Sequence, residues 1–206
     1  MTAVCQGRPD GEQGAKYSNV DPANAFRIIL QPGRQGSLPI GGIDVSVINR
    51  MSQAIVPKAF TVLPSEADKR TIIITLAKSL VAARKVKATE VDDIVEGAMA
   101  REAVGSTGIG HGIAIPHCRT DLVKNIVCAF GRCPEGLDFE SLDGEPVHSV
   151  FLLLTPTDQK EQHLHLMKNF AGIIRRDNFC DFLSQTTDAE GLISLDEAQT
   201  LQLFST

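Results

Sequence analysis

The 206 residues include 20 basic and 25 acidic side chains, a formal net charge of −5, and 43% of them are hydrophobic. A chain of this composition can bury its own core, and its acidity argues against nucleic acid or an anionic membrane surface as a partner. No apolar run approaches the roughly 18 residues of a membrane span, and no secretory signal opens the chain. We therefore expect a cytoplasmic protein without membrane insertion.

The first quarter of the chain differs from the rest. Residues 1–50 hold seven of the 17 glycines and four of the ten prolines. This composition predicts an N-terminal extension over 1–51 that is partly disordered or loosely packed. Within it, 26–30 and 43–48 could form short strands, and Met51 could be an alternative start of translation. The remaining residues, 52–206, are expected to form one domain.

The domain begins with a predicted strand and two predicted helices. Residues 58–63 form a strand pattern that Pro64 ends, and Ser65 is the candidate N-cap of the first helix. Apolar residues at helical spacing predict its buried face: Ile72, Ile73, Leu76, Ala77 and Leu80. Thr89 is the candidate N-cap of the second helix, which runs towards Arg101.

Two buried strands and a third helix complete the pattern. Residues 125–130 and 147–154 are continuous apolar runs, which are typical of strands covered on both faces. Asp158 and Glu161 resemble a capping box for a helix whose predicted buried residues are Leu164, Met167, Ala171 and Ile174. Short helical segments are expected over 179–183 and 192–203. The alternation of strands and helices predicts an α/β domain, a mixed sheet with helices on both faces.

A glycine-rich segment between the second helix and the next strand ends at Pro116 and His117. Its glycines expose backbone N–H groups that can bind an anion, but its spacing matches neither a P-loop nor a dinucleotide fingerprint. Proline restricts the backbone before His117, whose neutral imidazole is a competent nucleophile. Arg101 lies nearby, and the candidate phosphate-binding residues are Ser106, Thr107, Gly108, Gly110 and Gly112. The alternative is a tight turn followed by a histidine that only packs.

The five histidines all follow residue 110 and do not have equal claims to function: His111, His117, His148, His163 and His165. On a helix, His163 lies beside the apolar positions, whereas His165 points about 200° away to a wetter face. His163 is therefore the better candidate to meet His117. We expect His148 to make a hydrogen bond near a strand end, and His111 could line the site or face water.

A zinc site is the rival chemistry. His117, Cys118, Cys128, Cys133 and His163 could supply its ligands, but their spacing matches no common zinc motif. Neighbouring residues of a strand point to opposite faces, which separates His117 from Cys118. We therefore expect neither a metal nor another cofactor, and the cysteines are expected to be reduced core residues.

Two stretches of sequence resemble a known family. Residues 101–117 and 156–166 are similar to the two histidine motifs of the fructose/mannitol-type enzyme IIA domains of the bacterial phosphotransferase system. The resemblance covers about residues 52–200. It is strongest to the nitrogen-regulatory branch, through the Gly-Ser-Thr-Gly-Ile-Gly run from Gly105 and the His-Leu-His run from His163. The chain departs from that branch at His111, where Asn is frequent, and at Cys118, where a small residue is usual.

The resemblance implies a phosphotransferase component. It implies that His117 receives a phosphoryl group from an HPr-like carrier and that His163 and Arg101 support this group. It also implies a mainly regulatory role through an unknown regulated protein. Two alternatives stay open: a sugar-transport enzyme IIA that passes phosphate to a separate enzyme IIB, and a binding module of the same fold that carries no phosphate.

Overall fold

The computed structural model describes residues 54–174 and 183, which contain six strands, three α-helices and one 3₁₀ turn. In chain order these are β1 (Ile55–Val62), α3 (Lys69–Ala82), η1 (Ala88–Glu90), α4 (Val91–Glu102), β2 (Gly108–Gly110), β3 (Ile113–Ala114), β4 (His117–Arg119), β5 (Val127–Leu137), β6 (Val147–Thr155) and α5 (Lys160–Ile174). The predictions at 26–30, 43–48, 179–182 and 192–203, and the boundary at residue 51, lie outside the described residues.

The sheet is mixed, and β6 is at its centre. Its order is β1-β5-β6-β3-β2, and β4 also pairs with β6. β6 is antiparallel to β5 and parallel to both β3 and β4, which follow one another along the same edge. Ile113 lies opposite Ser149, and His117 lies opposite Leu153 further along β6. Because only two residues separate β3 from β4, His117 also pairs with β6, the central strand of the sheet.

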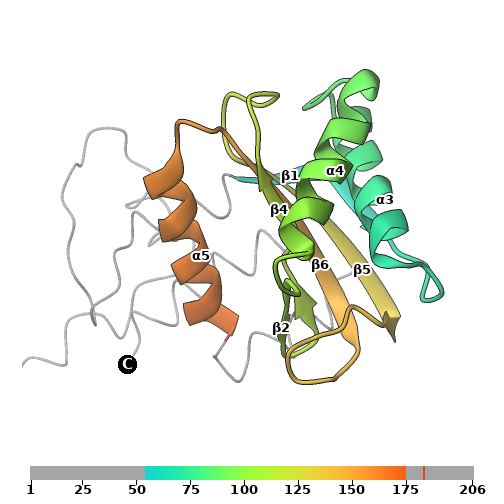
Figure 1. Ribbon diagram of the computed structural model, residues 1–206. Helices are drawn as coiled ribbons and strands as arrows, with labels where there is room; N and C mark the ends of the chain where they lie inside the picture. The colour runs from blue at the N-terminus through green and yellow to red at the C-terminus, as the bar shows by residue number, and fades with distance from the viewer. Residues whose placement is uncertain (1–53, 175–182, 184–206) are drawn as a thin grey trace, which may run out of the picture.

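Helices cover both faces of this sheet, as the sequence predicts. In Figure 1, α3 and α4 lie on one face and α5 lies on the other. The larger apolar cluster joins α3 and α4 to the sheet, and it includes the whole predicted face of the first helix. A second cluster joins α5 to the opposite face through Leu166 and Phe170. The phenyl ring of Phe170 packs edge-on against Phe151 of β6, with 5.3 Å between the ring centroids.

Two predicted helix caps are wrong. Asp68, not Ser65, caps α3, and its carboxylate accepts a hydrogen bond from the Thr71 N–H at 2.7 Å. The chain first makes a turn in which the Ala67 N–H donates to the Pro64 carbonyl, so the helix begins later. Thr89 lies within η1, and α4 has no side-chain cap. A hydroxyl residue followed by acidic residues is a cap signal in sequence, but it does not show that a turn lies between that residue and the helix.

The predicted buried face of the last helix is also wrong in part, because Met167 packs against the second cluster but two other predicted members are exposed. Leu164 is 50% exposed and Ala171 is exposed, whereas Leu166 and Phe170 are each 2% exposed. Two apolar stripes compete on this helix, and the stripe that contains the large aromatic ring packs against the sheet. Burying Phe170 together with Leu166 removes more apolar area from water than burying Leu164 together with Ala171 would.

The strand predictions are confirmed in position but differ in length. β1 starts three residues before the predicted 58–63, and β6 ends one residue after 154. β5 continues to Leu137, seven residues beyond the prediction. Its second half contains Pro134 and Gly136, which argue against a strand in sequence. The pairing with β6 is irregular there, between Arg132 and Leu137, and so these residues fit at the end of the strand.

Candidate functional site

His117 is presented by an interruption in the pairing of β3 and β4 with β6. At this interruption the Leu153 N–H donates to the Pro116 carbonyl at 3.0 Å, and the Ile115 N–H donates to Thr107 across the hairpin. The half-buried ring of His117 turns back so that Nδ1 lies 2.8 Å from the Ile115 carbonyl. A carbonyl oxygen only accepts, so Nδ1 carries the proton. Nε2 therefore keeps its lone pair for chemistry.

His163 comes from α5 and meets His117 across the site. The two ring centroids are 5.2 Å apart and the ring planes are tilted by 45°. On its other side, His163 Nδ1 lies 3.1 Å from the hydroxyl of Thr155 at the end of β6. The residue before α5 is joined to the loop between β4 and β5 by a hydrogen bond from Gln159 Nε2 to the Lys124 carbonyl. The structure thus brings together the two histidines that the sequence singles out.

The surroundings favour neutral histidines. Burial lowers the pKa of His117; the Ile115 carbonyl opposes this by raising the pKa, while the positive charge of Arg101 lowers it further. Burial also lowers the pKa of His163, and the charges of His117, Arg119 and Arg101 act in the same direction. With pKa values below 6.5, both rings are mainly neutral at pH 7, which keeps the His117 lone pair available.

Two arginines give the site its positive charge, and sequence reasoning identified only one of them. Arg101, in the last turn of α4, donates from Nη1 to the Gly105 carbonyl at 3.0 Å and lies close enough to influence both histidines. Arg119 was missed. It follows His117 by two positions in β4, and residues two apart in a strand share a face. That alternation was the available signal.

The glycine-rich segment forms the hairpin of β2 and β3. Gly110, His111 and Gly112 have φ values of 94°, 56° and 71°, in the left-handed region that glycine adopts without strain. A side chain on Gly108 would place its Cβ 2.9 Å from the backbone of Ser141. The segment can therefore pack closely against the loop before β6 because Gly108 and Gly110 lack side chains.

The predicted phosphate-binding residues already have partners within the protein. The Thr107 N–H and hydroxyl donate to the Glu102 carboxylate at 3.0 and 2.6 Å. The Ser106 hydroxyl donates to the Phe139 carbonyl and accepts from the Gly108 N–H. The Gly110 N–H donates to the Ser141 hydroxyl. These bonds hold the hairpin in shape, and direct contact between phosphate and Ser106, Thr107, Gly108, Gly110 or Gly112 stays a prediction.

Glu102 is a supporting residue that sequence reasoning missed. It is only 7% exposed, and besides Thr107 its carboxylate contacts Lys69 Nζ at 2.8 Å. Burial would raise the pKa of Glu102, but the hydrogen bonds and charge of Lys69 and the bonds from Thr107 outweigh it and lower the pKa. The residue directly after Arg101 thus fixes the start of the hairpin to α3. A lone charged residue at a helix end gives no sequence signal for this role.

The remaining candidates lie apart from the histidine pair. His165 and His148 are exposed, and His148 Nδ1 lies 3.2 Å from the Cys133 carbonyl, the strand-end hydrogen bond that was predicted. His111 is exposed on the hairpin. Cys118 points to the opposite face of β4 from His117 and packs against α4. Across 54–174 and 183, no group of three or more His, Cys, Asp or Glu side chains is placed to hold a metal.

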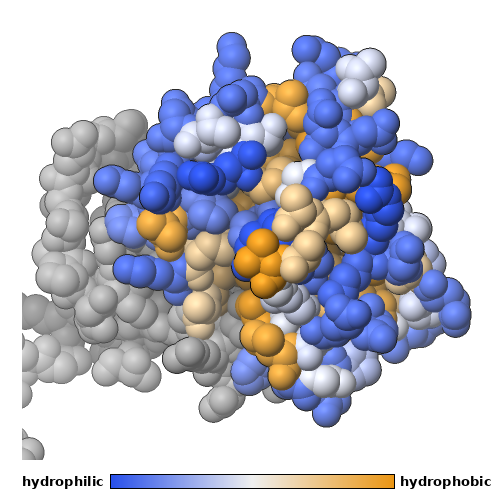
Figure 2. Space-filling view, in the orientation of Figure 1, coloured by the Kyte–Doolittle hydropathy of each residue, from blue (hydrophilic) through white to orange (hydrophobic). Residues whose placement is uncertain are grey.

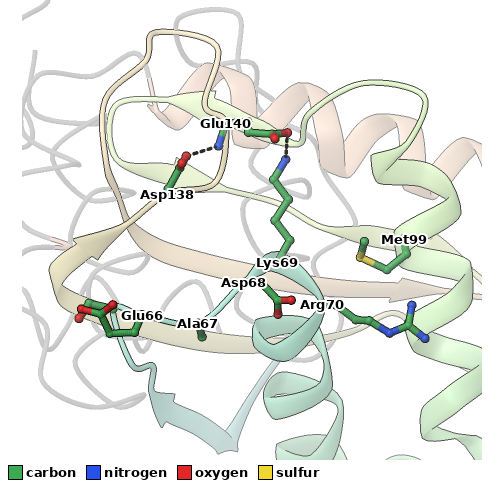
Figure 3. A pocket seen from close by; sticks show the side chains of 9 residues that line it. Glu66, Ala67, Asp68, Lys69, Arg70, Met99, Asp138 and Glu140 are labelled. Atoms are coloured by element: carbon green, nitrogen blue, oxygen red, sulfur yellow. Dashed lines mark hydrogen bonds and ion pairs between the residues drawn. The ribbon is translucent and has the colours of Figure 1, made fainter.

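A surface cavity of about 510 Å³ lies at the start of α3, away from the histidines. Figure 3 shows Lys69 reaching from α3 to Glu140 across this cavity. The cations that line it are paired, Lys69 with Glu102 and Glu140 and Arg70 with Glu96. The cavity is lined by Ser65, Glu66, Ala67, Asp68, Lys69, Arg70, Met99, Asp138 and Glu140. It therefore offers no free cation for an anionic substrate.

Comparisons with known proteins agree on one family. The model described as "Phosphoenolpyruvate-dependent sugar phosphotransferase system, EIIA 2" matches residues 55–197. A nitrogen regulatory protein of Pseudomonas aeruginosa is 34% identical over 146 residues, 71% of this chain and 94% of the relative. A PTS fructose-specific EIIA component of Haloferax volcanii is 39% identical over 85 residues, 40% of this chain and 55% of that protein. Nitrogen regulatory protein IIA-Ntr from Neisseria meningitidis matches with a TM-score of 0.63 at 27% identity, covering 71% of this chain and 98% of that one.

Proposed function

Because the chain belongs to the EIIA 2 family of the phosphoenolpyruvate-dependent sugar phosphotransferase system, we propose that it is a phosphohistidine carrier. His117 accepts a phosphoryl group from an HPr-like carrier, and the protein acts mainly as a nitrogen-type regulator. The observation that carries this proposal is the hydrogen bond from His117 Nδ1 to the Ile115 carbonyl, which leaves Nε2 as the only ring nitrogen with a free lone pair.

The transfer needs no cofactor. A nitrogen–phosphorus bond forms at His117 Nε2 while the donor's nitrogen–phosphorus bond breaks, and the electron pair of the broken bond returns to the donor imidazole. The proton on His117 Nδ1 stays in its bond to Ile115. A donor ring that likewise keeps a proton on its other nitrogen leaves as neutral imidazole. The step is nearly balanced in energy, so alignment and charge stabilisation supply the catalysis.

Three side chains support the transferring group in this proposal. Arg101 supplies positive charge for the equatorial oxygens, and Arg119 adds charge on the His163 side. His163 contacts the phosphoryl group from across the site. The hairpin residues Ser106 and Thr107 contribute chiefly by holding the shape of the segment, because their donors are bonded within it.

Exposed apolar residues offer a surface for the protein that brings the phosphate. Val104 is 84% exposed and follows Arg101 by three positions, while Leu164 is 50% exposed and follows His163. Leu142 is 76% exposed, and its N–H donates to the Gly108 carbonyl of the hairpin. Figure 2 shows hydrophobic side chains gathered near the middle of the view, between the positions of α4 and α5 in Figure 1. Such gathering is typical of a protein-docking surface.

Incubation with phosphoenolpyruvate, enzyme I and an HPr-type carrier is the test. Intact-protein mass spectrometry should find one acid-labile phosphoryl group on the wild type and on the exposed control His165→Gln, and none on His117→Gln. An unmodified wild type, tested with its cognate carrier, would leave the binding module as the function.

The sugar-transport alternative is favoured by one observation, the 39% identity to a fructose-specific EIIA component. Mixing the phosphorylated protein with a candidate enzyme IIB separates the two roles. Rapid transfer of phosphate to an IIB cysteine supports transport, whereas retained phosphate together with altered binding of another protein supports regulation.

A further inference from the structure

We propose that Thr155 is a positioning residue that fixes the tautomer of His163, so that His163 presents Nε2–H as a donor in the site. The inference rests on the proposed function and deepens it by assigning a second residue to the action of His163. Its starting point is the contact between Thr155 Oγ1 and His163 Nδ1, at 3.1 Å. Thr155 has no exposed surface, so water does not compete for this hydroxyl.

The direction of this hydrogen bond follows from the other partners of Thr155. A threonine hydroxyl can donate or accept, whereas a neutral imidazole nitrogen does only one. Within residues 54–174 and 183, His163 Nδ1 is the only hydrogen-bond partner of the Thr155 hydroxyl. If His163 donated, the buried hydroxyl hydrogen would have no acceptor, which is costly. Thr155 therefore donates to Nδ1, and the ring proton of His163 resides on Nε2.

This arrangement gives the two histidines complementary forms. His117 has its proton on Nδ1 and a free lone pair on Nε2, whereas His163 has its lone pair bonded and its proton on Nε2. Phosphoryl oxygens accept hydrogen bonds and do not donate them when ionised. Because His163 is neutral, it can bond a phosphoryl oxygen only through a protonated Nε2. The opposite tautomer would face that oxygen with a second lone pair.

The tautomer can be measured without any carrier protein. In ¹⁵N-labelled, unphosphorylated protein, the ring nitrogens of His163 should report a proton on Nε2 and a hydrogen-bonded lone pair on Nδ1. Thr155→Val should remove the hydrogen-bond shift at Nδ1, and Thr155→Ser should keep it. As a control, Thr157→Val removes a hydroxyl that bonds Asp121 at the start of α5 and should leave the Nδ1 signal in place. A wild-type proton on Nδ1 would overturn the proposal.

Phosphotransfer supplies the second readout. Thr155→Val should slow transfer from the HPr-type carrier by about 3-fold to 10-fold, the worth of one hydrogen bond, and Thr155→Ser should restore most of it. A Thr155→Val protein that folds and transfers at the wild-type rate would show that Thr155 positions nothing of consequence. If the wild type accepts no phosphate while the ring proton resides on Nε2, the proposed function fails and the tautomer assignment stands.

Discussion

The β4 edge and helix α5 each supply one histidine to the site, and they hold it by different means. His117 is fixed by a main-chain carbonyl within a strand that is paired to β6. His163 is fixed by one side-chain hydroxyl and by a helix that packs through Leu166 and Phe170. The proposed nucleophile, His117, is thus held by main-chain groups that substitution does not remove, whereas His163 depends on side chains that substitution can remove one at a time.

The difference extends to what lies behind each histidine. On the α4 side, Glu102 joins Lys69 to the glycine-rich hairpin in a buried network of charge-assisted hydrogen bonds. On the α5 side, the contacts to the sheet are apolar and aromatic apart from the single hydrogen bond between His163 and Thr155. Polar networks fix geometry more narrowly than apolar packing does, because their bonds are directional. The side of the site that holds His117 is therefore the more rigid one.

The largest expected effect tests whether both histidines depend on one charge. Arg101→Gln should slow phosphotransfer by about 100-fold, because it removes a donor that stabilises charge in the transition state. It should also raise the pKa of both His117 and His163, since the charge of Arg101 lowers both. NMR titration and a single-turnover transfer assay measure the two effects.

Arg119→Gln is the matched control for this prediction. Its charge lowers the pKa of His163, so the variant should raise that pKa while the His117 titration keeps its position. A shift of both histidines in Arg119→Gln would contradict the division of the site into two differently held halves.

The second effect concerns the rigid side. Glu102→Gln should lower the free energy of unfolding by about 2 kcal/mol, because it weakens the bonds from Lys69 and Thr107 in a buried position. Urea denaturation measures the change. Glu96→Gln, which weakens the exposed pair with Arg70, should have little effect. Equal losses in the two variants would mean that the buried network does not make this side rigid.

The same carboxylate gives a pH signature. The pKa of Glu102 is lower in the folded protein than in the unfolded chain. Its contribution to stability is therefore present above about pH 4.3, the unfolded value, and is lost as the pH falls through the folded pKa. Glu102→Gln should lack this part of the acid dependence, and a denaturation series from pH 3 to 7 shows whether it does.

The third effect, of moderate size, is the pH dependence that His117 and His163 give to the transfer rate and to stability. Both have pKa values below the usual value of about 6.5, so the transfer rate should stay level down to that pH and fall only below it. The unfolded chain binds protons on these rings first, so their contribution to stability is full above about pH 6.5 and is lost as the pH falls through the folded pKa values. A transfer rate that already halves at pH 7 would show that one ring is charged in the site.

The smallest effect tests a residue outside both halves. His111→Gly should stabilise the protein by about 0.5 kcal/mol, because His111 has a φ of 56° that glycine adopts without strain and the gain exceeds the entropy of the added glycine. Thermal unfolding measures it. Transfer should be unchanged, and a slower His111→Gly protein would bring His111 into the site.

The sequence predicted the candidate site residues better than the residues that hold them in place. The sequence singled out His117 and His163 because a histidine after a glycine-rich segment and helix periodicity leave local patterns, and it singled out Arg101 through its nearness and the family resemblance. Glu102 and Thr155 were not found, because their roles depend on which distant residue the fold brings beside them. The same limit explains α5, where periodicity identified His163 as lying at the edge of the core but could not decide between two apolar stripes. Local pattern indicates candidate reactive side chains, and only the packed structure reveals what orients them.

The alternation of side chains along β4 has a further consequence for chemical durability. Cys118 follows His117 directly, yet it is buried against α4, and this burial raises the pKa of its thiol to about 11. At neutral pH the thiol carries almost no thiolate, the form that peroxides and alkylating reagents attack. Reaction of Cys118 with such a reagent would therefore report a loosening of the sheet around it. The reactivity of the Cys118 thiol can therefore be used to measure whether β4 stays packed against α4.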